Sequence, residues 1–348
     1  MDLSRFDYTL PPELIAQVPA EPRDSSRLLV VHRSQDRLEH RTFRDVVEYL
    51  RPGDVLVLND SRVMRARLWL RRRPQGGRLE LLLLRRLERG SDGREVWQAL
   101  VRPGRRAPLG QALESDDGSL RARVLSRTPD GGRTLELEAP GGDVGAALSR
   151  IGTIPLPPYI RRPLDDPERY QTVYAREEGS AAAPTAGLHF TPELLQRIRD
   201  AGVDVVSLTL HVGVGTFRPV RTPVVEQHVM HEEFFTIPEA TAAAIREGRR
   251  RGGRIWAVGT TVVRALESAA ASDGEVRGGS AWTRLFIYPP YRFRVVDVLI
   301  TNFHLPRSTL LMLVCAFGGT ERILAAYREA VARRYRFYSL GDAMLILP

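Results

Sequence analysis

The stretch TPELLQRIRDAGVDVVSLTLHV, residues 191–212, contains the pattern of a complete helix followed by a complete strand. Thr191 is placed to cap the helix, Pro192 stands in its first turn, and Gly202 follows its last residue. The residues after the glycine are almost continuously apolar, which is typical of a strand buried on both faces of a parallel sheet. A helix joined to such a strand predicts a layered α/β fold.

The same alternation continues to the C-terminus, and two apolar runs near the N-terminus, at 27–33 and 53–60, are of the same kind. The segments expected to alternate are helices at 238–253, 261–271, 308–319 and 320–335, and strands at 254–260, 284–290, 295–303 and 342–347. The predicted main domain is therefore a largely buried sheet covered by helices.

Residues 62–150 have a different pattern, in which short runs, several of them alternating polar and apolar residues, are separated by GG, SDG, RPG, DDG and PDGG turns. This pattern predicts a small antiparallel β-barrel domain, inserted into an α/β domain made of residues 1–61 and 151–348. The proline-rich stretch at 154–160 is expected to be a stiff, extended connection back to the main domain.

The positive charge is concentrated in the predicted insertion. The chain has a net charge of +9, and residues 61–135 hold 18 arginines against 8 acidic residues. Such a patch attracts nucleic-acid backbones through counterion release and steering; the alternative is a set of strands whose solvent faces carry arginine. Because the chain contains no lysine, a GC-rich coding bias is the simplest reason for the use of arginine.

Several function classes are excluded by composition. No apolar run approaches the roughly 20 residues that cross a bilayer, and the first residues are acidic where a signal peptide is basic. We therefore expect a cytoplasmic protein with no membrane partner. The single cysteine, Cys315, lies in an apolar run and cannot form an internal disulfide or a thiolate metal cluster.

The motif Gly213-Val214-Gly215 follows the strand of the opening stretch and suggests a nucleotide site. A dinucleotide fingerprint needs a third glycine and a following helix, whereas here Arg218-Pro219 follows and prevents a helix from starting. The motif therefore builds no phosphate-binding loop. Two interpretations stay open: a tight turn, or glycines that let the backbone approach a flat group such as a base or ribose.

Polar residues follow several predicted strands, and ligands of open α/β sheets bind at the carboxyl ends of strands. Three such stretches are VLNDSRV at 57–63, GTT at 259–261 with the helix after it, and TNFHLPRST at 301–309. A fourth stretch, AAPTAGLHFT at 182–191, is expected to be a loop just before the start of a helix, where backbone donors are free. The candidates are Asn59, Asp60, Ser61, Arg62, Thr185, Gly187, His189, Thr261, Arg264, Asn302, His304 and Arg307.

A metal site is the weaker alternative for His228 and His231, which lie three residues apart. Their stretch has no clear helical face, the chain lacks an HExxH motif, and no thiol can assist. Serine hydrolase chemistry is disfavoured in the same way, because no G-x-S-x-G elbow occurs.

Several stretches together carry a family resemblance. They include FDYTLPPELIAQ, GDVLVLNDSRV, APTAGLHFT, TLHVGVGTFRPV, AVGTTVVRALES, LITNFHLPRSTLLMLV and RFYSLGDAMLI. In order and spacing, from residue 6 to 347, they resemble the S-adenosylmethionine:tRNA ribosyltransferase-isomerase family of the queuosine pathway. The resemblance implies a monomeric α/β domain with an inserted β-barrel. It also implies that the ribosyl part of S-adenosylmethionine moves onto the aminomethyl group of preQ1 at the tRNA wobble position, giving epoxyqueuosine-tRNA, adenine and methionine.

This reaction assigns expected roles to the candidates. Adenine needs a proton or a hydrogen-bond donor as it leaves, and the methylene beside the sulfonium needs a base. We expect His189 or His211 to be the acid or base, and Asp60 and Asn302 to be partners of the ribose or the amine. Arg264 and Arg307 are expected to hold the methionine carboxylate or a tRNA phosphate.

The remaining expectations concern binding. The expected substrate-binding residues are Asn59, Arg62, Thr185, Gly187, Gly213, Gly215, Thr216, Thr261, Arg264, His304 and Arg307. The expected tRNA-binding residues are Arg65, Arg71, Arg72, Arg73, Arg102, Arg105 and Arg106. No cofactor is expected, because S-adenosylmethionine is a consumed co-substrate, and no metal, because the sulfonium already activates its neighbours.

Two alternative functions stay open at this point. One is an S-adenosylmethionine-dependent RNA methyltransferase, which would release S-adenosylhomocysteine; the missing glycine-rich strand-to-helix motif counts against it. The other is a non-catalytic RNA-binding protein. It would leave unexplained the repeated polar strand ends and five of the seven histidines, those at 189, 211, 228, 231 and 304.

Overall fold

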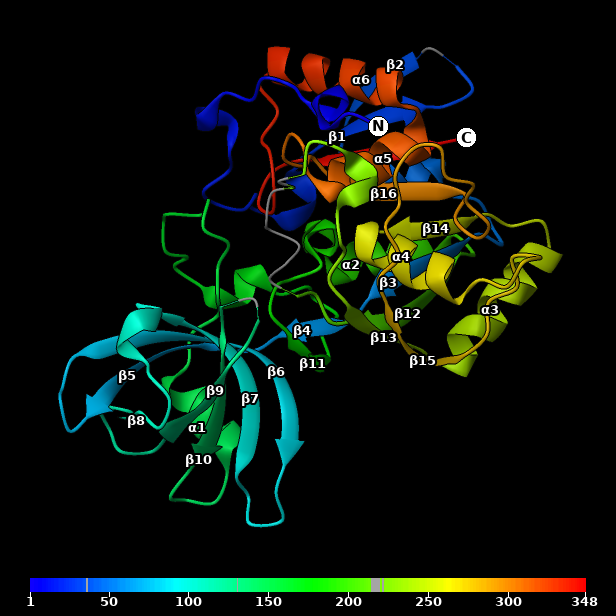
Figure 1. The fold of residues 1–348 in the computed structure, drawn as a ribbon. Helices are drawn as coiled ribbons and strands as arrows, with labels where there is room; N and C mark the ends of the chain where they lie inside the picture. The colour runs from blue at the N-terminus through cyan, green and yellow to red at the C-terminus, as the bar shows by residue number, and fades with distance from the viewer. Residues whose placement is uncertain (36, 130, 214–219, 221) are drawn as a thin grey trace. The chain divides into compact units, whose positions relative to one another are not determined.

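The computed structural model describes residues 1–35, 37–129, 131–213, 220 and 222–348. Within these, the chain forms two compact units. The α/β unit consists of residues 1–62, 157–177 and 183–348, and the barrel unit of residues 63–156 and 178–182. Both are drawn as ribbons in Figure 1. The predicted fold class, a layered α/β domain with an inserted antiparallel barrel, is confirmed.

The α/β unit is built on a nine-stranded mixed sheet, with the order β15-β13-β12-β3-β14-β16-β17-β1-β2. The strands are β1 (Arg27–His32), β2 (Arg37–Thr42), β3 (Val55–Asn59), β12 (Asp204–Leu210), β13 (Glu233–Ile237), β14 (Ile255–Val258), β15 (Gly279–Thr283), β16 (Val298–Asn302) and β17 (Ala343–Leu347). The four strands β12, β3, β14 and β16 are parallel to one another. Their carboxyl ends therefore lie at one edge of the sheet.

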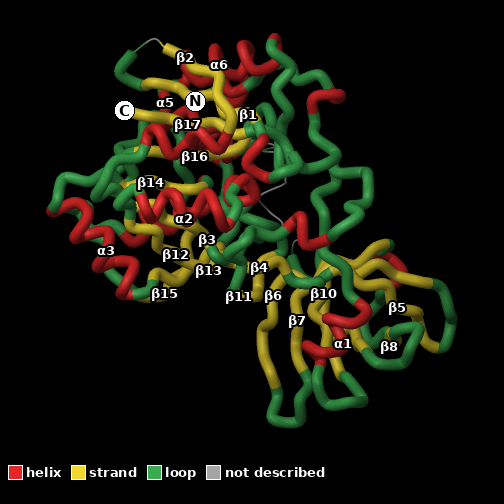
Figure 2. The backbone as a smooth tube through the Cα atoms, turned by 180° about the vertical axis from the view of Figure 1, so that it is seen from behind, coloured by secondary structure: helices red, strands yellow, loops and turns green. Residues whose placement is uncertain are grey.

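Helices cover both faces of this sheet. The helix α2 (Pro192–Asp200) buries Leu194, Leu195 and Ile198 in a core cluster with one face of the strands. On the other face, α3 (Glu239–Arg250) packs so closely that a side chain at Gly248 would meet Val55 of β3. Figures 1 and 2 show α3 and α2 on opposite sides of the sheet. The sheet is therefore buried from both sides, as its continuous apolar strands predict.

Three further helices follow at the C-terminal half of the unit: α4 (Thr260–Ala269), α5 (Thr309–Gly318) and α6 (Thr320–Ala332). Ser308 caps α5 by accepting a hydrogen bond from the backbone N–H of Leu311, at 3.1 Å, and Cys315 is buried inside it. Thr191 caps α2 in the same way, so both predicted caps are confirmed. In the described part of the chain, no single helix is long and apolar enough to cross a bilayer; only α5 and α6 together, bent by 113°, reach that length.

The barrel unit contains a closed six-stranded antiparallel barrel, with the order β10-β7-β6-β5-β8-β9. Its strands are β5 (Arg67–Arg73), β6 (Arg78–Arg89), β7 (Glu95–Arg102), β8 (Ala112–Glu114), β9 (Arg121–Arg127) and β10 (Arg133–Glu138). Alternate residues of each strand point inward and form one apolar core, to which α1 (Val144–Ile151) adds Val144 and Ala147. The short strands β4 (Ser61–Val63) and β11 (Glu177–Ser180) form a separate two-stranded sheet.

Two expectations about boundaries need correction. The expected strand at 284–290 is wrong; the edge strand β15 lies just before this stretch. The backbone of Leu285 is bonded to side chains instead of a strand. Its N–H donates to the Thr283 hydroxyl, and its carbonyl accepts from Arg264. The barrel unit also extends to residue 156 instead of 150. Its last segment is held by the bridge between Thr153 and Arg67.

Candidate functional site

A pocket opens in the α/β unit at the carboxyl ends of β14 and β16. It brings together six segments that are separated in the sequence, and it has both hydroxyl-bearing and apolar walls. Its lining residues are Tyr159, Ala183, Pro184, Thr185, Ala186, Val212, Gly259, Thr260, Thr261, Thr301, Asn302, Phe303, His304, Leu305, Ser308, Leu310, Tyr338 and Ser339. The predicted candidates Thr185, Thr261, Asn302 and His304 meet here.

One wall of the pocket is the start of α4. Gly259 follows β14 and precedes α4 with a φ of +92°, a conformation that L-residues with a Cβ rarely adopt. Its N–H donates to the Ile300 carbonyl at 2.7 Å. This turn places Thr260 and Thr261 in the first turn of the helix, facing the pocket. The backbone N–H groups of a first turn have no partner within the helix, so this wall offers hydrogen-bond donors.

A chain of hydrogen bonds leads from the pocket into the core. The Thr185 hydroxyl donates to Oδ1 of Asn302 at 2.8 Å, and Nδ2 of Asn302 donates to Nε2 of His189 at 3.1 Å. The other ring nitrogen of His189, Nδ1, lies 2.7 Å from the Ser26 hydroxyl. Thr185 and Asn302 line the pocket, whereas His189 and Ser26 lie behind it.

The environment of His189 keeps its ring neutral. The side chain is 4% exposed and stacks on Phe43, with ring centroids 4.9 Å apart. Burial, together with the positive charges of Arg336 and Arg23, lowers the pKa of His189 to about 3. Because both ring nitrogens have protein partners, His189 is poorly placed to exchange a proton with a ligand in the pocket.

His304 is the histidine that lines the pocket itself. Its Nε2 lies 2.7 Å from the Thr301 hydroxyl, and its backbone N–H donates to the Tyr327 hydroxyl at 3.0 Å. Burial lowers the pKa of His304 to about 3, so this ring is neutral too. A neutral imidazole offers one donor and one acceptor nitrogen to its surroundings.

Asn59 joins three neighbouring elements under the pocket. Its Oδ1 accepts from the N–H groups of Ser61 and Leu210, and its Nδ2 donates to the Leu210 carbonyl at 3.0 Å. Nδ2 also lies 3.3 Å from the Thr261 hydroxyl. Asn59 is fully buried and does not line the pocket. Its contacts hold the ends of β3, β12 and α4 together.

Asp60 lies outside this pocket and has a full set of partners. Its carboxylate accepts from Arg176 at 2.6 Å, from the Ser207 hydroxyl at 3.0 Å and from the Thr209 hydroxyl at 2.7 Å. It is 3% exposed, and its backbone carbonyl accepts from the N–H groups of Arg176 and Glu177. This geometry ties β3 to β12 and to the segment that follows residue 175.

His211 follows β12, and its N–H donates to the Phe234 carbonyl at 3.0 Å. Its Nδ1 is buried and has no hydrogen-bond partner among the described residues. Burial lowers the pKa of His211, while the negative charges of Glu177 and Asp60 act in the opposite direction. Of the two histidines expected to move protons, His211 is therefore the one with a ring nitrogen that no described residue bonds. Its side chain does not line the pocket, but the next residue, Val212, does.

Arg264 does not face the pocket. It is buried and forms an ion pair with Glu233, and its Nε donates to the Leu285 carbonyl at 3.1 Å. The other oxygen of the Glu233 carboxylate accepts from the Gly213 N–H at 3.0 Å. Arg264 thus anchors the start of the glycine-containing segment through Glu233. Gly215 and Thr216, which were expected to bind substrate, lie outside the described residues.

Three other candidates lie away from the pocket. Gly187 packs against Tyr174, and a Cβ at this position would lie 2.0 Å from its hydroxyl. Arg62 pairs with Glu168 at 2.8 Å, and Arg307 with Asp7 at 2.5 Å; both pairs are partly or fully exposed. Paired surface arginines of this kind can still exchange partners for a phosphate.

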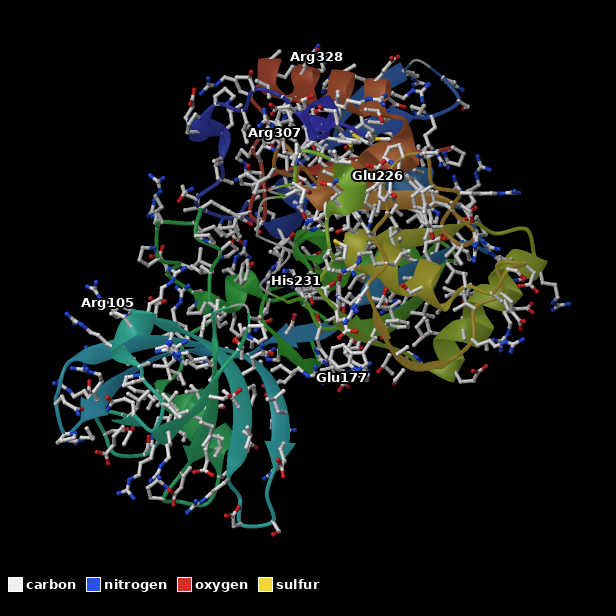
Figure 3. The ribbon with its side chains drawn as sticks, in the orientation of Figure 1. Arg105, Glu177, Glu226, His231, Arg307 and Arg328 are labelled. Atoms are coloured by element: carbon white, nitrogen blue, oxygen red, sulfur yellow. The ribbon has the colours of Figure 1, made fainter. Side chains whose placement is uncertain are left out.

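The barrel arginines divide into two groups. Arg71 pairs with Asp116 and Arg73 with Glu114, while Arg72 donates to the Gly76 carbonyl. In contrast, Arg65, Arg102, Arg105 and Arg106 are exposed, and none of these four is ion-paired with a described carboxylate. Arg105 lies at the outer surface of the barrel (Figure 3). The second group is the better candidate for phosphate contacts.

Sequence reasoning missed several residues that the structure places at the site. Tyr159 and Tyr338 line the pocket with ring centroids 4.8 Å apart, and Ser26 completes the buried hydrogen-bond chain. No spacing links these positions, which come from three distant segments. Thr260 and Thr301 also line the pocket, and their place beside Thr261 and Asn302 in the sequence was a usable signal. Among the described residues, no group of three His, Cys, Asp or Glu side chains could hold a metal ion, and His228 instead packs on Phe286.

Comparison with known proteins identifies relatives over the whole chain. A family model described as "Queuosine biosynthesis protein" matches residues 3–346. The S-adenosylmethionine:tRNA ribosyltransferase-isomerases of Moorella thermoacetica and Thermotoga maritima are 58% and 56% identical to this chain. Each match covers all of this chain and all of the relative. A crystal structure of S-adenosylmethionine tRNA ribosyltransferase from Thermotoga maritima is similar with a TM-score of 0.56 and 46% identity, covering 99% of this chain and 100% of that one.

Proposed function

The chain belongs to the queuosine biosynthesis protein family, and on that premise we propose which of its residues bind and convert the substrates. Its activity is that of an S-adenosylmethionine:tRNA ribosyltransferase-isomerase, so S-adenosylmethionine and tRNA are its substrates. The ribosyl moiety moves onto the aminomethyl group of preQ1 in the tRNA and is isomerised, while adenine and methionine leave. The methyltransferase alternative is not favoured.

The adenosyl part of S-adenosylmethionine occupies the pocket at the ends of β14 and β16. The observation that supports this assignment is the convergence there of four predicted candidates from three distant segments. Leu305 and Leu310 provide apolar surface for a base. Thr185 and the first turn of α4 provide hydrogen-bonding groups of defined direction.

Proton transfer is assigned to His211 instead of His189. Both ring nitrogens of His189 are bonded within the protein, whereas Nδ1 of His211 has no described partner. The lowered pKa of His211 keeps the ring neutral, and a neutral ring can accept the proton that the methylene beside the sulfonium must lose. Asp60 and Glu177 stabilise the positive charge that then forms on the ring.

The tRNA backbone is bound by arginines of the barrel unit. Arg102, Arg105 and Arg106 are exposed close together in the sequence, at the end of β7 and in the turn that follows it. Arginine at such a surface contacts phosphates without reading sequence. The wobble nucleotide must be unstacked before its amine can react, because the reactive group is otherwise held within the anticodon stack. We further propose that the chain acts as a monomer in the cytoplasm.

The placement of the adenosyl group is tested by narrowing the pocket. Leu310→Trp adds bulk at a partly exposed lining position, so we expect the dissociation constant for S-adenosylmethionine to rise at least about tenfold in equilibrium dialysis. The matched control, Val229→Trp, changes an exposed residue outside the pocket and should leave binding unchanged. Unchanged binding by Leu310→Trp would place the adenosyl group elsewhere.

The reaction itself is tested by its small products. The protein is mixed with S-adenosylmethionine and preQ1-containing tRNA, and the products are separated by chromatography. Adenine and methionine are expected in equal amounts. Release of S-adenosylhomocysteine would indicate methyl transfer instead, and absence of turnover would indicate a protein that only binds RNA.

A further inference from the structure

We propose that His189 is a positioning residue that fixes Thr185 as a hydrogen-bond acceptor, so that the pocket selects a ligand carrying an amino donor at the position that Thr185 faces. The ligand group we assign to Thr185 is the 6-amino group of the adenine base. This inference rests on the proposed function, because it requires the adenosyl group to occupy the pocket. It adds the reason why the base must be adenine and not its 6-oxo counterpart.

The direction of the Asn302 amide follows from its neighbours. Nδ2 of Asn302 lies 3.4 Å from the Tyr338 carbonyl, and a carbonyl can only accept a hydrogen bond. The nitrogen of the amide must therefore point to Tyr338 and His189, and the oxygen to Thr185. In this orientation, Nε2 of His189 accepts a hydrogen bond and carries no proton.

The tautomer of His189 agrees with this direction. A neutral imidazole has one protonated nitrogen, and Nε2 is unprotonated, so the proton is on Nδ1. Nδ1 lies 2.7 Å from the Ser26 hydroxyl, which accepts it. The low pKa of His189 excludes a second proton at neutral pH. Phe43 stacks on the ring and restricts its rotation, so the nitrogens keep these places.

The consequence reaches the pocket through Thr185. Its only hydroxyl hydrogen is donated to Oδ1 of Asn302 at 2.8 Å. The hydroxyl can then present only lone pairs to a ligand. An amino group donates to these lone pairs, whereas a 6-oxo group would oppose them with a second acceptor. A threonine without this fixed partner would rotate its hydroxyl and serve either ligand.

The test compares S-adenosylmethionine with its analogue in which a 6-oxo group replaces the 6-amino group of the base. Dissociation constants for both are measured by equilibrium dialysis, with no turnover required. The wild-type protein is expected to prefer the amino form by at least about tenfold, because the opposed acceptors would leave polar groups unpaired. Thr185→Val should abolish this preference, and Thr185→Ser should retain it.

Two variants behind the pocket test the role of His189. Ser26→Ala removes the acceptor for the Nδ1 proton, which frees the tautomer, and His189→Leu removes the ring nitrogens. In both variants, the ratio of the dissociation constants for the 6-oxo and 6-amino ligands is expected to fall several-fold, toward a value of one. The affinity for the 6-amino ligand should be mostly retained. If His189 had a purely structural role, the variants would weaken binding of both ligands equally. The ratio of the two dissociation constants would then be unchanged, and this result would overturn the proposal.

Failure of the proposed function gives a different pattern. If the adenosyl group does not occupy the pocket, neither Thr185→Val nor Leu310→Trp changes binding of either ligand. If it does occupy the pocket but Thr185 is not a fixed acceptor, Leu310→Trp weakens binding and the wild-type preference is absent. Circular dichroism and thermal melting of Ser26→Ala verify that the variant is folded before the ratio is interpreted.

Discussion

Nδ2 of Asn302 donates to Nε2 of His189 across 3.1 Å, and this contact joins the wall of the pocket to the apolar core. One side of the pair lines the pocket, and the other stacks on Phe43. Changes at His189 are therefore expected to influence both stability and ligand selection.

Truncation at His189 is expected to destabilise the protein. His189→Ala removes a buried ring, leaves a cavity beside Phe43 and deprives Asn302 of an acceptor, at a cost of about 2–4 kcal/mol. The measurement is the melting temperature by calorimetry, compared with His231→Ala at an exposed position. An unchanged melting temperature, with loss of turnover alone, would instead restore His189 as a residue that acts on the substrate.

Acid is expected to weaken the fold below pH 6.5. The pKa values of His189 and His304 are about 3 in the folded protein, against about 6.5 in an unfolded chain. Between pH 6.5 and 3 the unfolded chain binds protons at these sites that the folded one does not, so stability is lost as the pH falls. Each histidine contributes about 1.4 kcal/mol per pH unit in that range. Above pH 6.5 they contribute no slope.

This dependence is measured from melting temperatures at pH 7.5, 6 and 5. A variant without the buried imidazole, His189→Asn, should show a smaller decrease than the wild type over the same range. Equal slopes for the two proteins would show that His189 is protonated without loss of the fold.

A methyl group at Gly187 is expected to disturb the site indirectly. The added Cβ would lie 2.0 Å from the Tyr174 hydroxyl and 2.9 Å from Cγ2 of Thr172, so the turn that carries Thr185 must shift. We expect Gly187→Ala to lower stability by about 1–3 kcal/mol and to raise KM for S-adenosylmethionine. Gly141→Ala is the control, since nothing lies within 4 Å of its added Cβ. Equal stability and equal KM of the two variants would contradict the close packing of Gly187 against Tyr174.

Arg105 and Arg106, which form no ion pair with a described carboxylate, are expected to contribute most to tRNA binding. Replacing Arg105 and Arg106 together by Gln should lower affinity and reduce the slope of log K against log salt by about 1.5. The matched control replaces Arg71 and Arg73, which already pair with Asp116 and Glu114. Affinities come from filter binding at several salt concentrations. A larger loss of tRNA affinity in the control variant would indicate that the phosphates bind near Arg71 and Arg73 instead.

Much of the fold was predictable because local signals agreed with one another. The Thr191 and Ser308 caps, the apolar strands and the turn-rich insertion each follow from short-range chemistry. The strand expected at 284–290 failed for a tertiary reason. The backbone of Leu285 is bonded by the side chains of Thr283 and Arg264, and this contact is invisible in a local pattern.

Sequence reasoning named four residues that the structure brings into one pocket, and their role in binding substrate stays a prediction. Strand-end reasoning named Thr261, Asn302 and His304, because parallel strands bring their carboxyl ends together. Thr185 was named for its place in a loop before a predicted helix. Sequence reasoning could not separate pocket residues from supports such as Asn59. Nor could it show that Ser26, from a distant segment, bonds to His189. Such distinctions depend on side-chain direction, which single-sequence patterns do not contain.

The position of β3 in the sheet affects how the protein folds during its synthesis on the ribosome. This central strand is translated before the barrel unit, yet both of its partners, β12 and β14, come after it. At 5–20 residues per second, the roughly 145 residues between β3 and β12 take about 7 to 30 s to make. All six barrel strands are complete by residue 138 and depend on no later strand. The barrel is therefore expected to fold before the nine-stranded sheet. Until β12 and β14 are made, both edges of β3 are unpaired. We expect chaperones that shield apolar segments to bind this strand during synthesis.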